Sequence, residues 1–174
     1  LLSIAAGVRI ATIEAAVGAD VAVVRAMPNT PALVRLGASA IAAGSRAGAD
    51  DVAWAESILS AVGIVERMTE PELDLFTGVA GSGPAYVFLV AEALTEAAVA
   101  DGMARPVAER VVQQLLLGSA TLLAREGDPA LLRERVTSPG GTTAAGLRVL
   151  DSLGVRAAFG AAVRSATERS RELG

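Results

Sequence analysis

The chain contains the stretch Thr137-Ser138-Pro139-Gly140-Gly141-Thr142-Thr143-Ala144-Ala145-Gly146, which is typical of a tight turn that opens directly into a helix. Pro139 has no backbone N–H, and two glycines permit backbone angles that other residues avoid. Residues 142–153 are compatible with a helix, which Gly154 would end. A helix start leaves about four N–H groups without partners and carries roughly half a positive charge. These donors suit a carboxylate or phosphate, although the pattern also fits an ordinary Ser/Thr cap.

Composition limits the chemistry that this chain can perform. Its 174 residues include no His and no Cys, and all 15 basic residues are Arg. A Ser-His-Asp triad, a Lys Schiff base and a zinc site with nitrogen or sulfur ligands are therefore excluded within the chain. We expect no metal site. Catalysis would depend on hydroxyls, carboxylates, Arg, the single Tyr, backbone donors or a cofactor that supplies the difficult step.

Charge and hydropathy predict the environment of the protein. The net charge of −4 comes without a basic face, so we expect no nucleic-acid partner. We find no uninterrupted apolar run of membrane-spanning length and predict no membrane association. No basic segment precedes the apolar N-terminus, so no signal peptide is predicted. The absence of Cys fits a cytoplasmic location, which we expect for this protein.

Residues 1–69 alternate between predicted strands and helices. The periodicity predicts strands over residues 1–8, 21–27, 36–43 and 64–68, and helices over residues 9–17 and 50–62. The last strand contains Glu66 and Arg67, which indicates a position near an edge of the sheet. This alternation is typical of an α/β layer with a largely parallel sheet.

Residues 70–174 show no further strand pattern and are predicted to be helical. Helices are expected over residues 70–77, 84–101, 106–126, 129–136 and 142–153, and from residue 155 onward. The helix over 84–101 is apolar nearly all round, with a single polar stripe of Glu92, Thr95 and Glu96. Such a helix must be buried, either inside a bundle or between subunits. The fold class is therefore α/β followed by an all-α part.

Two further segments are rich in Gly or Pro. Gly81-Ser82-Gly83-Pro84 has neither the spacing of a dinucleotide fingerprint nor that of a nucleophile elbow, and we predict that it serves tight helix packing. Met27-Pro28-Asn29-Thr30-Pro31 follows a predicted strand, at the end where open α/β sheets bind ligands. There Asn29 would recognise an amide or a ribose hydroxyl, or would form a plain Asx turn.

Three segments, in this order and spacing, resemble the pyrroline-5-carboxylate reductase family: Met27-Pro28-Asn29-Thr30-Pro31-Ala32, Gly81-Ser82-Gly83-Pro84-Ala85-Tyr86 and Ser138-Pro139-Gly140-Gly141-Thr142-Thr143. The resemblance covers nearly the whole chain, and the Ser-Pro-Gly-Gly-x-Thr element is highly specific to that family. It implies reduction of 1-pyrroline-5-carboxylate to L-proline by NADPH or NADH, the last step of proline biosynthesis. It also implies a Rossmann-type domain, here residues 1–69, and a helical substrate-binding and dimerisation domain, here residues 70–174.

The resemblance implies a homodimer, or an assembly of such dimers, and it assigns roles to individual residues. Thr143 would be the catalytic residue that contacts the ring nitrogen, and the substrate carboxylate would bind at Ser138, Gly141 and Thr142. Glu70 would lie near the substrate amine, or would simply be an acid at a helix N-terminus. The cofactor would pass Ala5, Ala6, Met27 and Asn29. Position 135 is Arg, where some members of the family carry Asn close to the cofactor.

The chain departs from the family in one large respect. The Gly-x-Gly-x-x-Gly fingerprint that binds the cofactor pyrophosphate is not found in these 174 residues. We therefore expect this chain alone to bind cofactor poorly and to be inactive. Two alternatives stay open at this point. One is a related hydroxy-acid dehydrogenase, although such enzymes commonly use a Lys that is absent here, and the other is a non-enzymatic helical dimerisation module.

Overall fold

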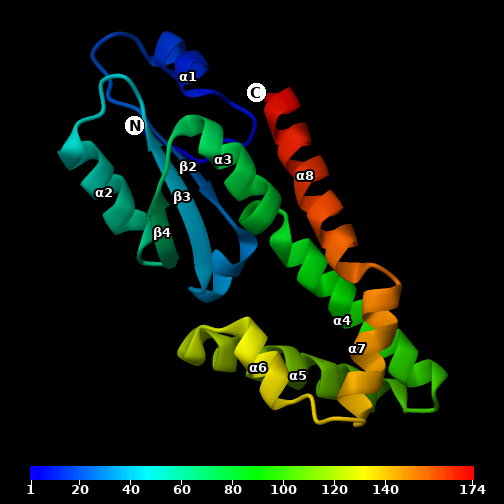
Figure 1. The fold of residues 1–174 in the computed structure, drawn as a ribbon. Coiled ribbons are helices and arrows are strands. Elements are labelled where there is room, and N and C mark those ends of the chain that lie inside the picture. Colours follow the sequence, from blue (N-terminus) through cyan, green and yellow to red (C-terminus); the bar gives the residue numbers. More distant parts are fainter. The chain divides into compact units, whose positions relative to one another are not determined.

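The computed structural model describes all 174 residues and divides the chain into two compact units (Figure 1). The first unit comprises Leu1–Ala85 together with Gly160–Gly174, and the second comprises Tyr86–Phe159. The predicted boundary at residue 69 marks the change from strands to helices. As a domain boundary it stays a prediction.

The first unit is built on a four-stranded mixed sheet. Its strands are β1 (Leu2–Ser3), β2 (Val24–Pro28), β3 (Gly37–Ala43) and β4 (Gly63–Arg67), which lie side by side in that order. The pairs β1–β2 and β3–β4 are parallel, as the alternating pattern predicts. The central pair β2–β3 is antiparallel, which differs from the parallel arrangement expected there. Only the short 3-10 helix η1 (Thr30–Val34) joins these two strands, and a connection of that length permits a hairpin but no crossover.

Helices cover both faces of the sheet and form two separate cores (Figure 1). Helices α1 (Ile10–Val17) and α3 (Glu70–Phe76) pack on one face, and α2 (Ala49–Leu59) packs on the other. Successive side chains of a strand point to opposite faces. The α1–α3 core contains Ile10, Ile13, Val23, Ala40, Ala42, Leu73 and Phe76. The α2 core contains Val24, Ala26, Ile41, Ala55 and Leu59.

Several predicted boundaries differ from the observed ones. The first predicted strand, residues 1–8, is reduced to Leu2–Ser3, and the following residues form a turn and a loop that lead into α1. The helix predicted over residues 50–62 ends at Leu59. Strand β4 lies at the edge of the sheet, as its charged residues indicate.

Helix α3 continues into α4 (Gly83–Ala100) through a single π-helical turn, η2 (Thr77–Gly81). The Gly-rich turn predicted here is wrong: the Ser82 N–H donates to the Thr77 carbonyl at 2.8 Å, and the chain stays helical. By length and composition alone, the run Glu70–Ala100 satisfies the requirements of a membrane span, a test that core helices of soluble proteins also pass. This run is interrupted by polar and charged residues, and the absence of a membrane partner stays a prediction.

The start of α3 is stabilised by its own side chains. Glu72 accepts hydrogen bonds from the Thr69 N–H and the Thr69 hydroxyl, each at 2.7 Å. The backbone bond first, and then the hydroxyl bond, holds the pKa of Glu72 below its ordinary value. This capping box stabilises the first turn of α3.

The second unit contains helices only. Besides the greater part of α4, it comprises α5 (Arg105–Glu126), α6 (Pro129–Arg135), α7 (Thr142–Ser152) and the first turn of α8 (Val155–Leu173). Each helix begins and ends within two residues of its predicted bounds. Asp128 caps α6 as expected and accepts from the N–H groups of Ala130 and Leu131 at 2.9 and 3.1 Å.

Close helix packing occurs at Gly78 rather than within Gly81-Ser82-Gly83-Pro84. A Cβ on Gly78 would clash with Thr167 Oγ1 and would lie 2.8 Å from the Val163 carbonyl oxygen, both on α8. A Cβ on Gly83 would meet no atom within 4 Å. The prediction of close packing in the later segment is therefore corrected, because η2 and not the start of α4 faces α8 closely.

We predict that Gly78→Ala lowers the free energy of unfolding by about 1–3 kcal/mol, because α8 must shift to accommodate the methyl group. Gly83→Ala is the matched control and should leave stability unchanged or raise it by about 0.4–1 kcal/mol. Chemical denaturation followed by circular dichroism measures both. Equal stabilities for the two variants would contradict the packing described here.

Candidate functional site

The turn before α7 has the predicted turn-to-helix geometry. Gly140 has a φ of 71°, in the left-handed region that favours glycine. The Gly141 N–H donates to the Ser138 carbonyl at 3.0 Å, and Gly141 is the N-cap of α7. Ser138 and Gly140 are exposed. The turn is thus ordered by its own hydrogen bond and lies open to solvent.

The first turn of α7 presents donors that nothing in the chain satisfies. The N–H groups of Thr142, Thr143 and Ala144 have no backbone acceptor, and the glycine cap supplies no side chain. A Cβ on Gly141 would clash with Ser138 Oγ, so glycine lets the serine hydroxyl lie over the turn. Since the N-terminal end of a helix is positive, this arrangement suits a carboxylate. Of the predicted donors, only the Gly141 amide is already occupied.

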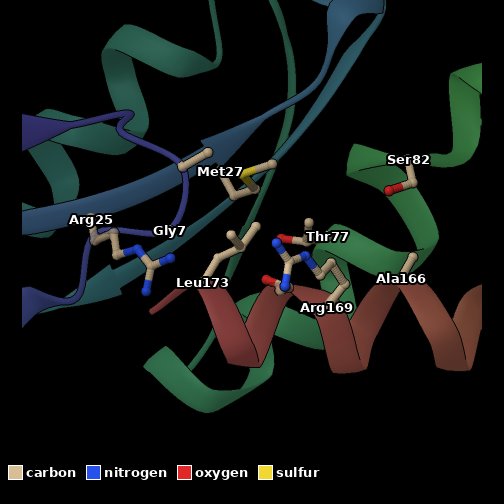
Figure 2. Close-up of a pocket in the computed structure, with 10 residues that line it drawn as sticks. Gly7, Arg25, Met27, Thr77, Ser82, Ala166, Arg169 and Leu173 are labelled. Carbon is tan, nitrogen blue, oxygen red and sulfur yellow. The ribbon is translucent and has the colours of Figure 1, made fainter.

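The first unit contains a cavity of about 230 Å³. Figure 2 shows side chains from β2, from the α3–η2 segment and from α8 around it. The cavity is lined by the following residues: Ala6, Gly7, Arg25, Met27, Thr77, Ser82, Ala166, Arg169, Ser170 and Leu173. Two of the four residues predicted to contact a cofactor, Ala6 and Met27, are therefore brought together.

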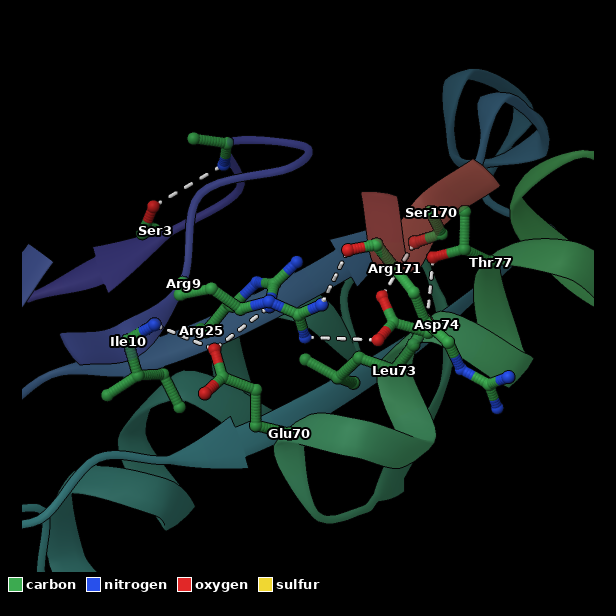
Figure 3. Close-up of polar contacts among 11 residues, drawn as sticks. Ser3, Arg9, Ile10, Arg25, Glu70, Leu73, Asp74, Thr77, Ser170 and Arg171 are labelled. Atoms are coloured by element: carbon green, nitrogen blue, oxygen red, sulfur yellow. Dashed lines mark hydrogen bonds and ion pairs between the residues drawn. The ribbon is translucent and has the colours of Figure 1, made fainter. Parts of the chain in front are cut away.

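Arg25 and Glu70 form an ion pair beside this cavity. Arg25 lies on β2 with only 4% of its surface exposed, and its Nη1 donates to Glu70 Oε1 at 2.9 Å. The same oxygen accepts from the Ile10 N–H at 2.7 Å, which satisfies an open amide at the start of α1 (Figure 3). Glu70 therefore has an observed structural role, at the start of α1 as well as of its own helix. Its proposed contact with a substrate amine stays a prediction.

A second carboxylate of α3 joins three segments that are distant in the sequence. Asp74 Oδ2 accepts from Arg9 Nη1 at 3.0 Å, and Asp74 Oδ1 accepts from the Ser170 hydroxyl at 2.7 Å (Figure 3). The side chain of Asp74 is almost completely buried. Sequence reasoning missed this residue, because only the fold reveals its partners.

The Asn29 side chain connects η2 to β3. Its Nδ2 donates to the Ala80 carbonyl at 3.0 Å, and its Oδ1 accepts from the Ala38 N–H at 2.9 Å. These bonds reach η2 and β3, so the residue does more than form a local Asx turn. The predicted contact of Asn29 with a cofactor stays a prediction.

The predicted site residues belong to two different units. Ala5, Ala6, Met27, Asn29 and Glu70 lie in the first unit, and the second contains Ser138, Gly141, Thr142 and Thr143. Ala5 is exposed and does not line the cavity. Arg25 and Arg169 line it and were not predicted, because nothing in their local sequence distinguishes them from surface arginines.

Comparison with known proteins identifies the family. The sequence profile described as pyrroline-5-carboxylate reductase dimerisation matches residues 70–173. A pyrroline-5-carboxylate reductase of Synechocystis is 47% identical over 175 residues, which cover 100% of this chain and 65% of that protein. The chain belongs to the pyrroline-5-carboxylate reductase family. The reductase of Pseudomonas aeruginosa is 45% identical over 99% of this chain and 64% of its own length.

Solved structures of family members share the fold. A pyrroline-5-carboxylate reductase from Coxiella burnetii aligns with a TM-score of 0.94 and 41% identity, over 99% of this chain and 65% of that one. The Plasmodium falciparum pyrroline carboxylate reductase, solved with NADP bound, aligns with a TM-score of 0.91 and 33% identity, over 100% and 71% of the two chains. The present chain spans about 65% of the length of the curated reductases that it matches. The α/β and helical parts predicted from the sequence are thus those of this family.

We predict that Asn29→Asp lowers the free energy of unfolding by about 1–3 kcal/mol, because a carboxylate replaces the amide donor that faces the Ala80 carbonyl. Thr30→Ala, at the exposed neighbouring position, should change stability by less than about 0.5 kcal/mol. Thermal unfolding of both variants provides the measurement. If Asn29→Asp is as stable as the control, the link between η2 and β3 contributes little to stability.

Proposed function

We propose that the complete protein, expressed from its whole coding sequence, reduces 1-pyrroline-5-carboxylate to L-proline with NADPH or NADH. The observation that carries this proposal is the set of unpaired amides at the start of α7, which lies within the element most specific to the reductase family. The names of relatives that match the full chain support it. The product is that of the last step of proline biosynthesis.

The substrate carboxylate would bind at the first turn of α7. The N–H groups of Thr142 and Thr143 and the exposed hydroxyl of Ser138 are the available donors. The amide of Gly141 already donates to the Ser138 carbonyl and is not available to the substrate. Gly141 would instead let the substrate approach the backbone closely, because it has no side chain. A charge-assisted hydrogen bond to a carboxylate is about twice as strong as a neutral one, so two or three such donors would fix the orientation of the ring.

The hydroxyl of Thr143 would hold the ring nitrogen. A Thr hydroxyl is too weak an acid to protonate an imine readily. In our proposal, the imine therefore binds already protonated, and Thr143 fixes the orientation of its C=N bond. The bound nicotinamide supplies the hydride. This chemistry requires no His, Cys or Lys, in agreement with the composition of the chain.

The cavity of the first unit would receive the nicotinamide end of the cofactor. Ala6 and Gly7 allow close access to the backbone, Met27 provides a flexible apolar surface, and the volume of about 230 Å³ accommodates a flat ring. Ala5 and Asn29 would lie at its margin. Glu70 would reach the substrate amine through Oε2, because both of its hydrogen bonds engage Oε1.

The helical region would form a homodimer, or an assembly of dimers. None of the residues of α4 is buried within the chain, and it exposes Val87, Phe88 and Leu89. A helix this apolar requires a partner surface. The match of residues 70–173 to a dimerisation region supports this proposal. A soluble, cytoplasmic enzyme with no nucleic-acid or membrane partner fits these proposals.

A non-enzymatic dimerisation module is the second candidate. It is favoured by one observation, the absence of the phosphate-binding fingerprint from these 174 residues. The two candidates differ in an assay of NAD(P)H oxidation with the cyclic imine. The complete protein should be active and residues 1–174 alone inactive if the reductase proposal holds, whereas inactivity of both would favour the module.

We predict that Thr143→Val in the complete protein lowers kcat/KM for the imine about 10²-fold, because it removes the positioning hydroxyl at similar volume. Thr121→Val, at an exposed position on α5, is the matched control and should retain the activity of the wild type. Steady-state oxidation of NADPH measures both. An unchanged kcat/KM for Thr143→Val would remove Thr143 from the mechanism.

We also predict that Phe88→Glu dissociates the dimer, because it places a charge in the apolar face of α4. Ile64→Glu on β4 is the control, since both side chains are 64% exposed within the chain and Ile64 lies outside the matched dimerisation region. Light scattering should give a dimer or larger assembly for the wild type and Ile64→Glu, and a smaller species for Phe88→Glu. A monomeric wild type would contradict the proposal.

A further inference from the structure

We propose that Asp74 is a positioning residue of the reductase, which fixes the two walls of the cavity in the first unit relative to each other. This inference rests on the proposed function for its catalytic consequence. Asp74 does not line the cavity, and only 2% of its surface is exposed. Its effect on the reaction would therefore pass through the residues that it holds.

The two walls come from opposite ends of the chain. One wall is the loop between β1 and α1, which contributes Ala6 and Gly7. The other is the last part of α8, which contributes Ala166, Arg169, Ser170 and Leu173 (Figure 2). These walls meet directly, because a Cβ on Gly7 would lie 3.3 Å from both the Cβ and the carbonyl oxygen of Leu173.

Each oxygen of Asp74 holds one wall. Oδ1 accepts from the hydroxyl of Ser170, which itself lines the cavity. Oδ2 accepts from the guanidinium of Arg9, two residues after Gly7. Arg9 also reaches the Arg171 carbonyl through Nη2 at 3.4 Å, near the negative end of α8. The contacts form a closed ring of loop, α3 and α8 (Figure 3).

The burial of the Asp74 carboxylate explains why its contacts would fix the relative position of the loop and α8. A buried ion pair is rarely a large net source of stability, because both charges lose hydration. The Asp74 side chain is 3% exposed and that of Arg9 is 23% exposed, so a loop position that withdraws Arg9 would leave the Asp74 charge uncompensated in a low dielectric and is disfavoured. Asp74 thus restricts the loop and α8 to one relative position. With the nicotinamide placed beside Ala6, that position would set the distance of hydride transfer.

The test uses the complete protein and compares Asp74→Asn with Leu59→Ala. The Asn variant preserves the shape of the side chain and removes its charge. The Ala variant creates a cavity in the α2 core, on the other face of the sheet, and controls for a general loss of stability. The first readout is hydrogen exchange of residues 5–9 and 166–173. We expect faster exchange in both segments for Asp74→Asn than for Leu59→Ala at matched stability.

The second readout is steady-state kinetics. Asp74→Asn should lower kcat/KM for NAD(P)H about 10- to 100-fold, because a displacement on the order of 1 Å at the reacting atoms has effects of this size. Its KM for the imine should change by less than about twofold, since the carboxylate would bind at α7. The double variant Asp74→Asn/Arg9→Gln should be no worse than the more affected single variant, because the two residues act through one contact.

The outcomes separate this inference from the proposed function. Unchanged exchange in both segments overturns the role of Asp74 whatever the activity. Faster exchange with kinetics equal to those of Leu59→Ala shows that Asp74 is only structural and also overturns the proposal. If the wild type does not oxidise NAD(P)H with the imine, the proposed function fails, and the catalytic role of Asp74 fails with it, while the exchange data still decide whether Asp74 links the walls.

Discussion

Helix starts in this protein depend on one constraint, which is that the first backbone amides of a helix must find acceptors outside it. Four helices have carboxylates of the chain bonded at their starts: Glu70 bonds to the start of α1, Asp51 to the residue before α2, Glu72 to the residue before α3, and Asp128 to the start of α6. No carboxylate of the chain bonds to the start of α7: its cap is Gly141, and the N–H groups of Thr142, Thr143 and Ala144 have no acceptor in the chain. The proposed binding of the substrate carboxylate depends on these open amides together with the Ser138 hydroxyl.

Two of the three carboxylates of α3 organise the first unit through bonds to other elements. Glu70 and Asp74 lie one helical turn apart, and each holds an arginine from another element. Glu70 fixes the start of α1 against β2, and Asp74 connects the loop before α1 to α8. A short loop and a terminal helix thereby become walls of one cavity. The second unit, in contrast, exposes an apolar helix and an unfilled helix start, which are features of a surface that binds partners.

Local chemistry made much of the fold predictable. Gly127, Asp128 and Gly154 mark helix ends correctly, because caps act through neighbouring residues. The antiparallel pairing of β2 with β3 was missed, although the short connection through η1 leaves no room for a crossover. The π-helical turn at Thr77–Gly81 was missed because its glycines are also typical of a loop. The residues of the candidate site also divide into those that the sequence indicates and those that it does not. The α7 turn was visible as a motif, and Ala6 and Met27 were suggested by family resemblance. Arg25 and Asp74 could not be found, because their significance lies in burial and in partners distant in sequence.

The most direct test of the central claim is a crystal structure of the complete protein with L-proline. We predict that the proline carboxylate lies within hydrogen-bonding distance of the amides of Thr142 and Thr143 and of the Ser138 hydroxyl. Proline bound elsewhere, with these amides still without an acceptor, would contradict it.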